Sequence, residues 1–125
     1  VLYNADKSIL IKYPSGSKLY SLEVAESVVE INDYAFENCS TLSEIVISSS
    51  VEYIGIGTFF NCYLEKIIVD KDNQMYSSDE NGVLFNKNKT SLIAYPINSG
   101  KTNYSIPDTV TEIEENAFNT ERKRT

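Results

Sequence analysis

The chain repeats one phrase of sequence at an interval of 23 residues, and this repeat constrains its fold more than any other feature. The segment VVEINDYAFENC at residues 28–39 returns as VEYIGIGTFFNC at residues 51–62. Valine, isoleucine, phenylalanine, asparagine and cysteine stand at the same places in both copies. A repeat period of about 20 to 50 residues is typical of stacked-repeat architectures. The repeat therefore has to be interpreted before any local secondary structure.

The apolar residues that follow each cysteine also repeat, at an interval of 22 residues. The residues related by this interval are Leu42 and Leu64, Ile45 and Ile67, and Ile47 and Val69. Apolar and polar residues alternate within both stretches, which predicts a strand in each copy with these six side chains directed inward. Because each repeat can bury its apolar residues only against its neighbours, we expect the strands to pair as a parallel ladder on one face of a solenoid.

A longer repeat relates the two ends of the chain. Residues 1–36 align without a gap on residues 83–118, with 14 identities in 36 positions. The V-x-x-I-x-x-x-[AT]-F phrase thus occurs three times, and we expect Phe36, Phe59 and Phe118 to fill one continuous interior. The segment DYAFENC predicts a short helical turn opposite the strand ladder. Two apolar runs around the polar sequence NKNK predict a hairpin or an expanded coil edge.

The stretch LSEIVISSSVEYIGIGTFFNC resembles the BspA-type (Treponema-type) leucine-rich repeat, L-x-x-I-x-I-P-x-x-V-x-x-I-G-x-x-A-F-x-x-C over about 23 residues. The resemblance covers nearly the whole chain. Ser48 replaces the usual proline, Ile56 and Gly57 depart from the pattern, and the last copy lacks its cysteine. The resemblance implies a secreted or surface-attached protein that mediates adhesion to host or matrix proteins or to other cells, without catalytic activity or a cofactor.

The predicted fold is an α/β-type repeat solenoid of the leucine-rich repeat kind. It is expected to be a right-handed coil with a parallel strand ladder on one face, short helical turns opposite and a hairpin-like expanded coil. Residues 1–125 are expected to form a single domain from a longer protein, with residues 121–125 as a polar tail. Both ends begin or stop within a repeat, so the open ends of the solenoid are also predicted to allow self-association.

Composition narrows the function further. The chain has no histidine, which removes the usual general base near neutral pH and the commonest zinc ligand. Eighteen acidic against eleven basic residues give a net charge of −7, the wrong sign for binding nucleic acid. No apolar run approaches the roughly 20 residues that cross a bilayer, so membrane attachment is expected only through an anchor outside this chain. The expected partner is an extracellular protein or glycan.

The outward side chains of the strand ladder are the predicted binding face. Exposed aliphatic residues there favour a contact surface, whereas the preference of branched residues for strands explains them equally well. A structural spacer that holds another domain away from the cell is therefore an alternative function. The predicted partner-binding residues are Glu23, Glu44, Val46, Lys66, Ile68, Asp70 and Ser105.

Cys39 and Cys62 occupy the same place in adjacent copies, within bridging range if the coils stack. Buried free thiols are the favoured interpretation, and a disulfide stays open. The acidic stretch DKDNQMYSSDENG lacks the glycine and glutamate that an EF-hand needs at its sixth and twelfth places, so it is interpreted as a solvated connecting loop. Its acidic residues are Asp70, Asp72, Asp79 and Glu80.

Asparagines in glycosylation sequons and tyrosines also occur along the repeats. Glycosylation of the three N-x-[ST] sequons stays open, and the first of their asparagines is expected to bond to backbone; they are Asn38, Asn88 and Asn103. Tyr13 and Tyr95 recur at one repeat position, which predicts a structural role. The tyrosines predicted to lie on the surface are Tyr34, Tyr53, Tyr63 and Tyr76.

Overall fold

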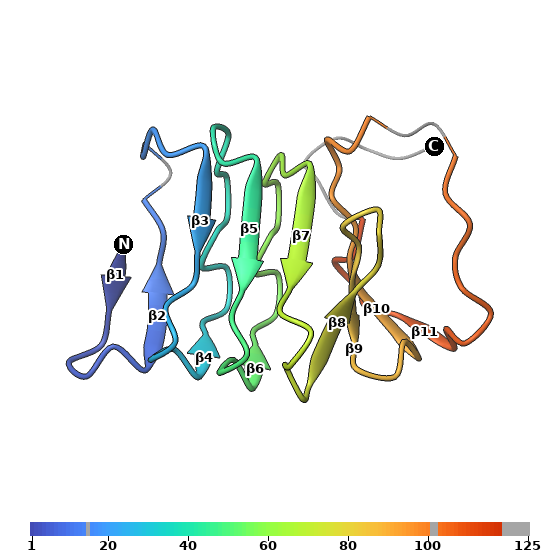
Figure 1. Ribbon diagram of the computed structural model, residues 1–125. Coiled ribbons are helices and arrows are strands. Elements are labelled where there is room, and N and C mark those ends of the chain that lie inside the picture. Colours follow the sequence, from blue (N-terminus) through green and yellow to red (C-terminus); the bar gives the residue numbers. More distant parts are fainter. Residues whose placement is uncertain (15, 101–102, 119–125) are drawn as a thin grey trace.

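The computed structural model describes residues 1–14, 16–100 and 103–118, and the predicted polar tail at residues 121–125 lies outside them. The chain forms a row of stacked coils with the N-terminus at one end and a hairpin-containing unit at the other (Figure 1). We call residues 9–23, 28–47 and 51–69 the first, second and third coils, and residues 83–118 the C-terminal unit.

The predicted parallel ladder is confirmed. It consists of β3 (Ser21–Glu23), β5 (Glu44–Ile47) and β7 (Lys66–Val69), in that order. Leu22, Ile45 and Ile67 lie opposite one another in register. The six apolar residues related by the 22-residue interval are all buried, as predicted.

A second ladder runs along the coils, and the sequence did not lead us to expect it. It is formed by β1 (Leu2–Tyr3), β2 (Ile9–Lys12), β4 (Glu30–Ile31) and β6 (Tyr53–Ile54). β2, β4 and β6 are parallel, and β1 pairs antiparallel with β2. The V-x-x-I phrase forms β4 and β6, which are two residues long and therefore too short to show an alternating pattern.

The third sheet contains β8 (Tyr76–Ser78), β9 (Leu84–Asn86), β10 (Ser91–Ala94) and β11 (Glu112–Ile113). β8, β9 and β10 pair antiparallel, which confirms a hairpin around NKNK, and β11 is parallel to β10. The 82-residue repeat maps β2 onto β10 and β4 onto β11. The antiparallel pair β8–β9 stands between β7 and β10 (Figure 1).

The predicted short helical turns are not confirmed, because the described residues contain no helix and residues 33–38 form consecutive turns. Tyr34 and Asn38 adopt left-handed backbone angles, with φ of 56° and 63°. Alternate N–H groups in this segment bond to the next coil: those of Tyr34, Phe36 and Asn38 donate to the carbonyls of Ile56, Thr58 and Phe60 at 2.9–3.1 Å. A helix would need those N–H groups for its own carbonyls four residues earlier.

The asparagines at the ends of these turns bond to each other, so the prediction that Asn38 bonds to backbone is wrong. Asn61 also has a left-handed φ of 56°, which asparagine tolerates better than most residues. Its side-chain nitrogen donates to Oδ1 of Asn38 at 2.8 Å. The side chain of Asn38 therefore bonds to the equivalent side chain on the next coil rather than to backbone.

The interior of the described part of the chain consists of two clusters, so the prediction of one continuous core is wrong. In the larger cluster, the ring of Phe36 stacks on Tyr13 at 5.3 Å and on Phe59 at 5.5 Å between centroids. Phe118 lies in the smaller cluster, stacked on Tyr95 at 5.1 Å. The hairpin separates them, since neighbouring residues of β9 face opposite sides: Leu84 joins the larger cluster and Phe85 the smaller.

Candidate functional site

The outer face of the β3–β5–β7 sheet gathers five of the predicted binding residues. In one row Glu44 lies opposite Lys66, and in the next row Glu23, Val46 and Ile68 lie side by side on the three strands. Glu23 and Lys66 are exposed, and the other three are half-buried. The face thus combines charged groups with aliphatic side chains that are partly accessible.

The other two predicted residues, Asp70 and Ser105, lie outside the strands of this sheet. Asp70 follows β7 and closes a turn, because its Oδ1 accepts the N–H of Asp72 at 2.8 Å. Ser105 is exposed but lies in a segment without a strand, so the prediction that it extends the row is wrong. The backbone of the inserted hairpin lies beside β7 instead: the N–H of Ile67 donates to the carbonyl of Gly82 at 2.9 Å.

Cys39 and Cys62 are buried free thiols, which agrees with the favoured interpretation. A hydrogen bond between them lowers the pKa of Cys39 and raises the pKa of Cys62, and burial raises the pKa of Cys62 further. A thiol reacts as the thiolate, so the raised pKa makes Cys62 a poor nucleophile.

The acidic stretch 70–82 is more ordered than a solvated loop, and that prediction needs correction. It contains β8, and Asn73 within it is fully buried. Asn73 uses every hydrogen-bonding position of its amide: Nδ2 donates to the carbonyls of Ser48 and Val51, and Oδ1 accepts the N–H groups of Met75 and Tyr76. In the part of the chain that the structure describes, no group of three potential ligands could hold a metal ion.

Asp79 stabilises the start of the C-terminal unit. Its Oδ1 accepts the N–H groups of Asn81 and Val83, each at 3.0 Å. Its Oδ2 accepts the hydroxyl of Tyr104. Burial raises the pKa of Tyr104, and the hydrogen bond to Asp79 raises it further.

The tyrosines divide largely as expected. Tyr13 is buried and Tyr95 stacks in the smaller cluster, which supports their structural role. Three of the four predicted surface tyrosines are exposed: Tyr34, Tyr53 and Tyr63. The fourth prediction is wrong, because Tyr76 is half-buried and its hydroxyl accepts the N–H of Ile54 at 2.8 Å.

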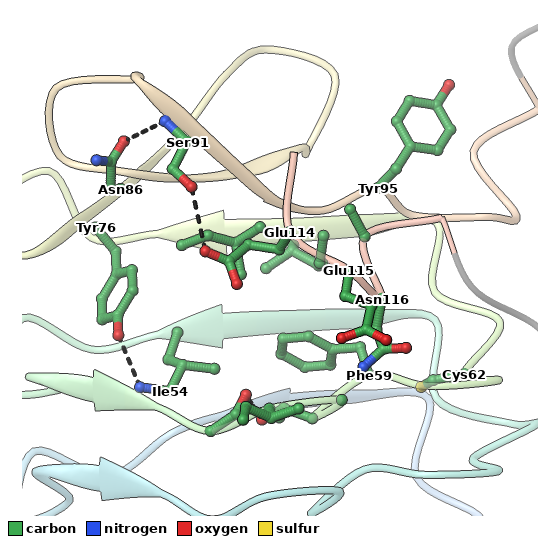
Figure 2. Close-up of a pocket in the computed structure, with 18 of the residues that line it drawn as sticks. Ile54, Phe59, Cys62, Tyr76, Asn86, Ser91, Tyr95, Glu114, Glu115 and Asn116 are labelled. Atoms are coloured by element: carbon green, nitrogen blue, oxygen red, sulfur yellow. Dashed lines mark hydrogen bonds between the residues drawn. The ribbon is translucent and has the colours of Figure 1, made fainter. Parts of the chain in front are cut away.

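A pocket of about 550 Å³ lies between the third coil and the C-terminal unit, and sequence reasoning missed it (Figure 2). One wall is formed by residues 53–59 of the third coil, and the other by residues 91, 93–97, 112 and 114–117. Tyr76 closes one side through its bond to Ile54 (Figure 2). The only hint in the sequence is the 13-residue stretch 70–82, which precedes the second copy of the long repeat.

The charged residues that line this pocket in the described part of the chain are all acidic. Glu112, Glu114 and Glu115 line it and are exposed, and no lysine or arginine does so among the described residues. The hydroxyl of Ser91 donates to Oε2 of Glu114 at 3.2 Å, and its N–H donates to Oδ1 of Asn86 at 3.0 Å (Figure 2). Apolar side chains such as Ile93 and Leu64 line the remainder. The pocket can therefore accommodate a ligand with an apolar body and a positive charge.

Comparisons with known proteins agree with this architecture. The family described as "BspA type Leucine rich repeat region (6 copies)" matches residues 12–80. Within the described residues, no helix has the length and apolarity that crossing a membrane requires. A search of curated proteins gives no match.

Three solved structures are similar to the chain. The pneumococcal vaccine antigen PcpA is 31% identical over 74% of this chain, with a TM-score of 0.65. A leucine-rich repeat protein from Eubacterium ventriosum is 26% identical over 83%, with a TM-score of 0.62. A leucine-rich cell surface protein from Faecalibacterium prausnitzii is 22% identical over 98%, with a TM-score of 0.58, and shows the shared fold alone. The chain spans only 23%, 41% and 38% of the lengths of these three structures.

Proposed function

Because the chain belongs to the BspA-type leucine-rich repeat family, we propose that it is a non-enzymatic binding module of a secreted or surface-attached protein. The similarity to a bacterial vaccine antigen supports this location. An anchor outside this chain would attach the protein to the cell. The ligand is an extracellular protein of a host, a matrix or another cell, and nucleic acid is disfavoured by the net charge of −7.

The outer face of the β3–β5–β7 sheet is the observation that carries this proposal. Val46 and Ile68 lie side by side on it and are partly accessible, with Glu23 beside them and the Glu44–Lys66 pair in the next row. An apolar centre with charged neighbours is the usual composition of a protein-binding surface. A glycan ligand would use the charged residues and the adjoining loops more than the aliphatic centre.

The test is binding of the folded chain to immobilised matrix proteins, with the double variant Val46→Asp, Ile68→Asp. We expect this variant to lose at least about tenfold in affinity, because a desolvated carboxylate opposes burial at an interface. The matched control is Val29→Asp with Leu2→Asp, which adds the same charge at apolar positions that are 39% and 57% exposed and lie outside this sheet. Equal binding by both variants would refute the proposal that the outer face of the β3–β5–β7 sheet binds the ligand.

A structural spacer is the second candidate function, and the contacts between coils favour it. Backbone hydrogen bonds connect successive coils in both strand ladders and again in the turns. Stacked repeats connected in this way behave as a stiff rod. If the spacer role is correct, neither double variant changes attachment, whereas shortening the solenoid by one whole repeat changes the reach of the attached domain.

A further inference from the structure

We propose that the pocket between the third coil and the C-terminal unit binds an extended, basic peptide segment of a partner protein. This site lies outside the β3–β5–β7 face, and the inference does not depend on that face binding anything. Its strongest support is the backbone of the third coil, which repeats a docking edge that the second coil uses.

The second coil shows how such an edge works. The N–H of Tyr34 donates to the carbonyl of Ile56 at 3.1 Å, and the N–H of Phe36 donates to the carbonyl of Thr58 at 2.9 Å. These bonds attach the third coil to the second. The edge therefore offers two donors, two residues apart, to a segment that runs alongside it.

The third coil repeats this edge 23 residues later, at Gly57 and Phe59. Gly57 has the same left-handed backbone as Tyr34, with φ of 60° against 56°. Among the described residues, neither N–H has a hydrogen-bond partner, and both residues line the pocket. β6 is the last strand of its sheet in the described part of the chain, although the N–H of Ile54 already donates to the hydroxyl of Tyr76. Both donors lie in the turns of residues 56–61, next to the edge of that sheet, and addition of an extended segment to a sheet edge is a recurring mode of peptide recognition.

The opposite wall indicates the chemistry of the segment. Three glutamates line the pocket, and no basic residue of the described chain neutralises them there. The apolar positions Ile93 and Met75 also face this space. A volume of about 550 Å³ falls within the usual range of ligand sites. The fitting occupant is an extended segment in which lysine or arginine alternates with aliphatic residues.

Selection from a phage-displayed library of random heptapeptides, with the folded chain immobilised, tests this proposal. We expect the recovered peptides to be enriched in lysine, arginine and branched aliphatic residues. The peptides should slow amide hydrogen exchange at Gly57 and Phe59. Recovery of no peptide, or of peptides without basic residues, would overturn the proposal.

Two variants separate charge from fold. The triple variant Glu112→Gln, Glu114→Gln, Glu115→Gln should weaken the selected peptides by about tenfold or more at low salt. The control removes the same charge from exposed positions outside the pocket: Glu26→Gln, Glu65→Gln and Glu80→Gln. Ile56→Lys, at a lining side chain that is 60% exposed, should weaken binding similarly, whereas Val29→Lys should not. Equal effects of variant and control would refute the proposal that the glutamates of this pocket bind the basic peptide.

The backbone contribution needs a separate measurement. Each selected peptide is made in two forms, N-methylated on alternate residues, so that each form blocks one edge of the strand. Pairing through one edge predicts that only one form loses binding. Equal binding of both forms would show a side-chain or small-molecule site and overturn strand addition. Val46→Asp with Ile68→Asp should leave peptide binding unchanged, so failure of this site and failure of the strand face are distinguishable.

Discussion

Replacing Asn73 by alanine tests whether a buried amide connects the expanded coil to the stack. Nδ2 donates to the carbonyls of Ser48 and Val51, both at 2.9 Å, and Oδ1 accepts the N–H groups of Met75 and Tyr76, both at 2.8 Å. A net contribution of about 1 kcal/mol for each bond gives a loss of about 4 kcal/mol. For a domain with a stability of roughly 5–15 kcal/mol, this is a large fraction.

The measurement is urea unfolding followed by circular dichroism. We expect a lower midpoint with an unchanged slope, and a melting temperature lower by about 10–20 °C. Asn98→Ala is the matched control, because the side chain of Asn98 is exposed and bonds to no described residue; it should change the free energy of unfolding by less than about 0.5 kcal/mol. A loss below about 1 kcal/mol for Asn73→Ala would refute the reasoning.

The variant Asn73→Asp gives the same test a pH dependence. The introduced carboxylate faces two carbonyls in a buried site, which raises its pKa in the folded state above the unfolded value of about 3.9. The folded state then binds the proton more tightly, so the destabilisation relative to the native chain should shrink as the pH falls through the raised pKa. A difference in stability that does not vary with pH would contradict this.

Three further predictions concern a close approach between two coils, a raised pKa and two buried thiols. Gly55→Ala should lower the free energy of unfolding by about 1–3 kcal/mol in urea unfolding, because the added Cβ would lie 2.3 Å from Oδ1 and 2.5 Å from the backbone nitrogen of Asp33. Above the unfolded tyrosine pKa of about 10, stability should fall more steeply in the native chain than in Tyr104→Phe, because the raised pKa of Tyr104 favours the neutral form in the folded state. Cys39 and Cys62 should resist iodoacetamide in the native chain and react after unfolding in urea, as mass spectrometry would show; rapid native labelling would contradict their burial.

The parts of the fold that could be predicted are those where one repeat is long enough to show a period. The inward apolar residues of β5 and of β7 recur at an interval of 22 residues, so the direction, burial and pairing of these strands followed from the sequence. The second ladder could not be predicted from the sequence, because β4 and β6 have only two residues each. The turn at residues 33–38 has the composition of a helical turn, and only the position of the next coil determines where its N–H groups donate.

The candidate sites likewise differ in whether a repeat interval in the sequence determines them. Register alone brings Glu23, Val46 and Ile68 together, since it follows from the repeat interval. Ser105 corresponds to Glu23 in the 82-residue repeat, but such a repeat relates local conformation and does not determine what lies beside a strand. The pocket depends on how the third coil meets the C-terminal unit across the inserted hairpin, and no sequence interval encodes that distance.

The alternation of N–H groups in the turns determines where the length of a repeat can change. Between residues 33 and 38, one added amino acid would point the donors now used by the next coil toward the wrong side. The spacing of 23 before the cysteine and 22 after it differs by one residue, and the chain absorbs this difference in the corner between Cys62 and Leu64. The corners between strands and turns are thus the places where a repeat can gain or lose residues. The hydrogen bonds between neighbouring coils are then retained.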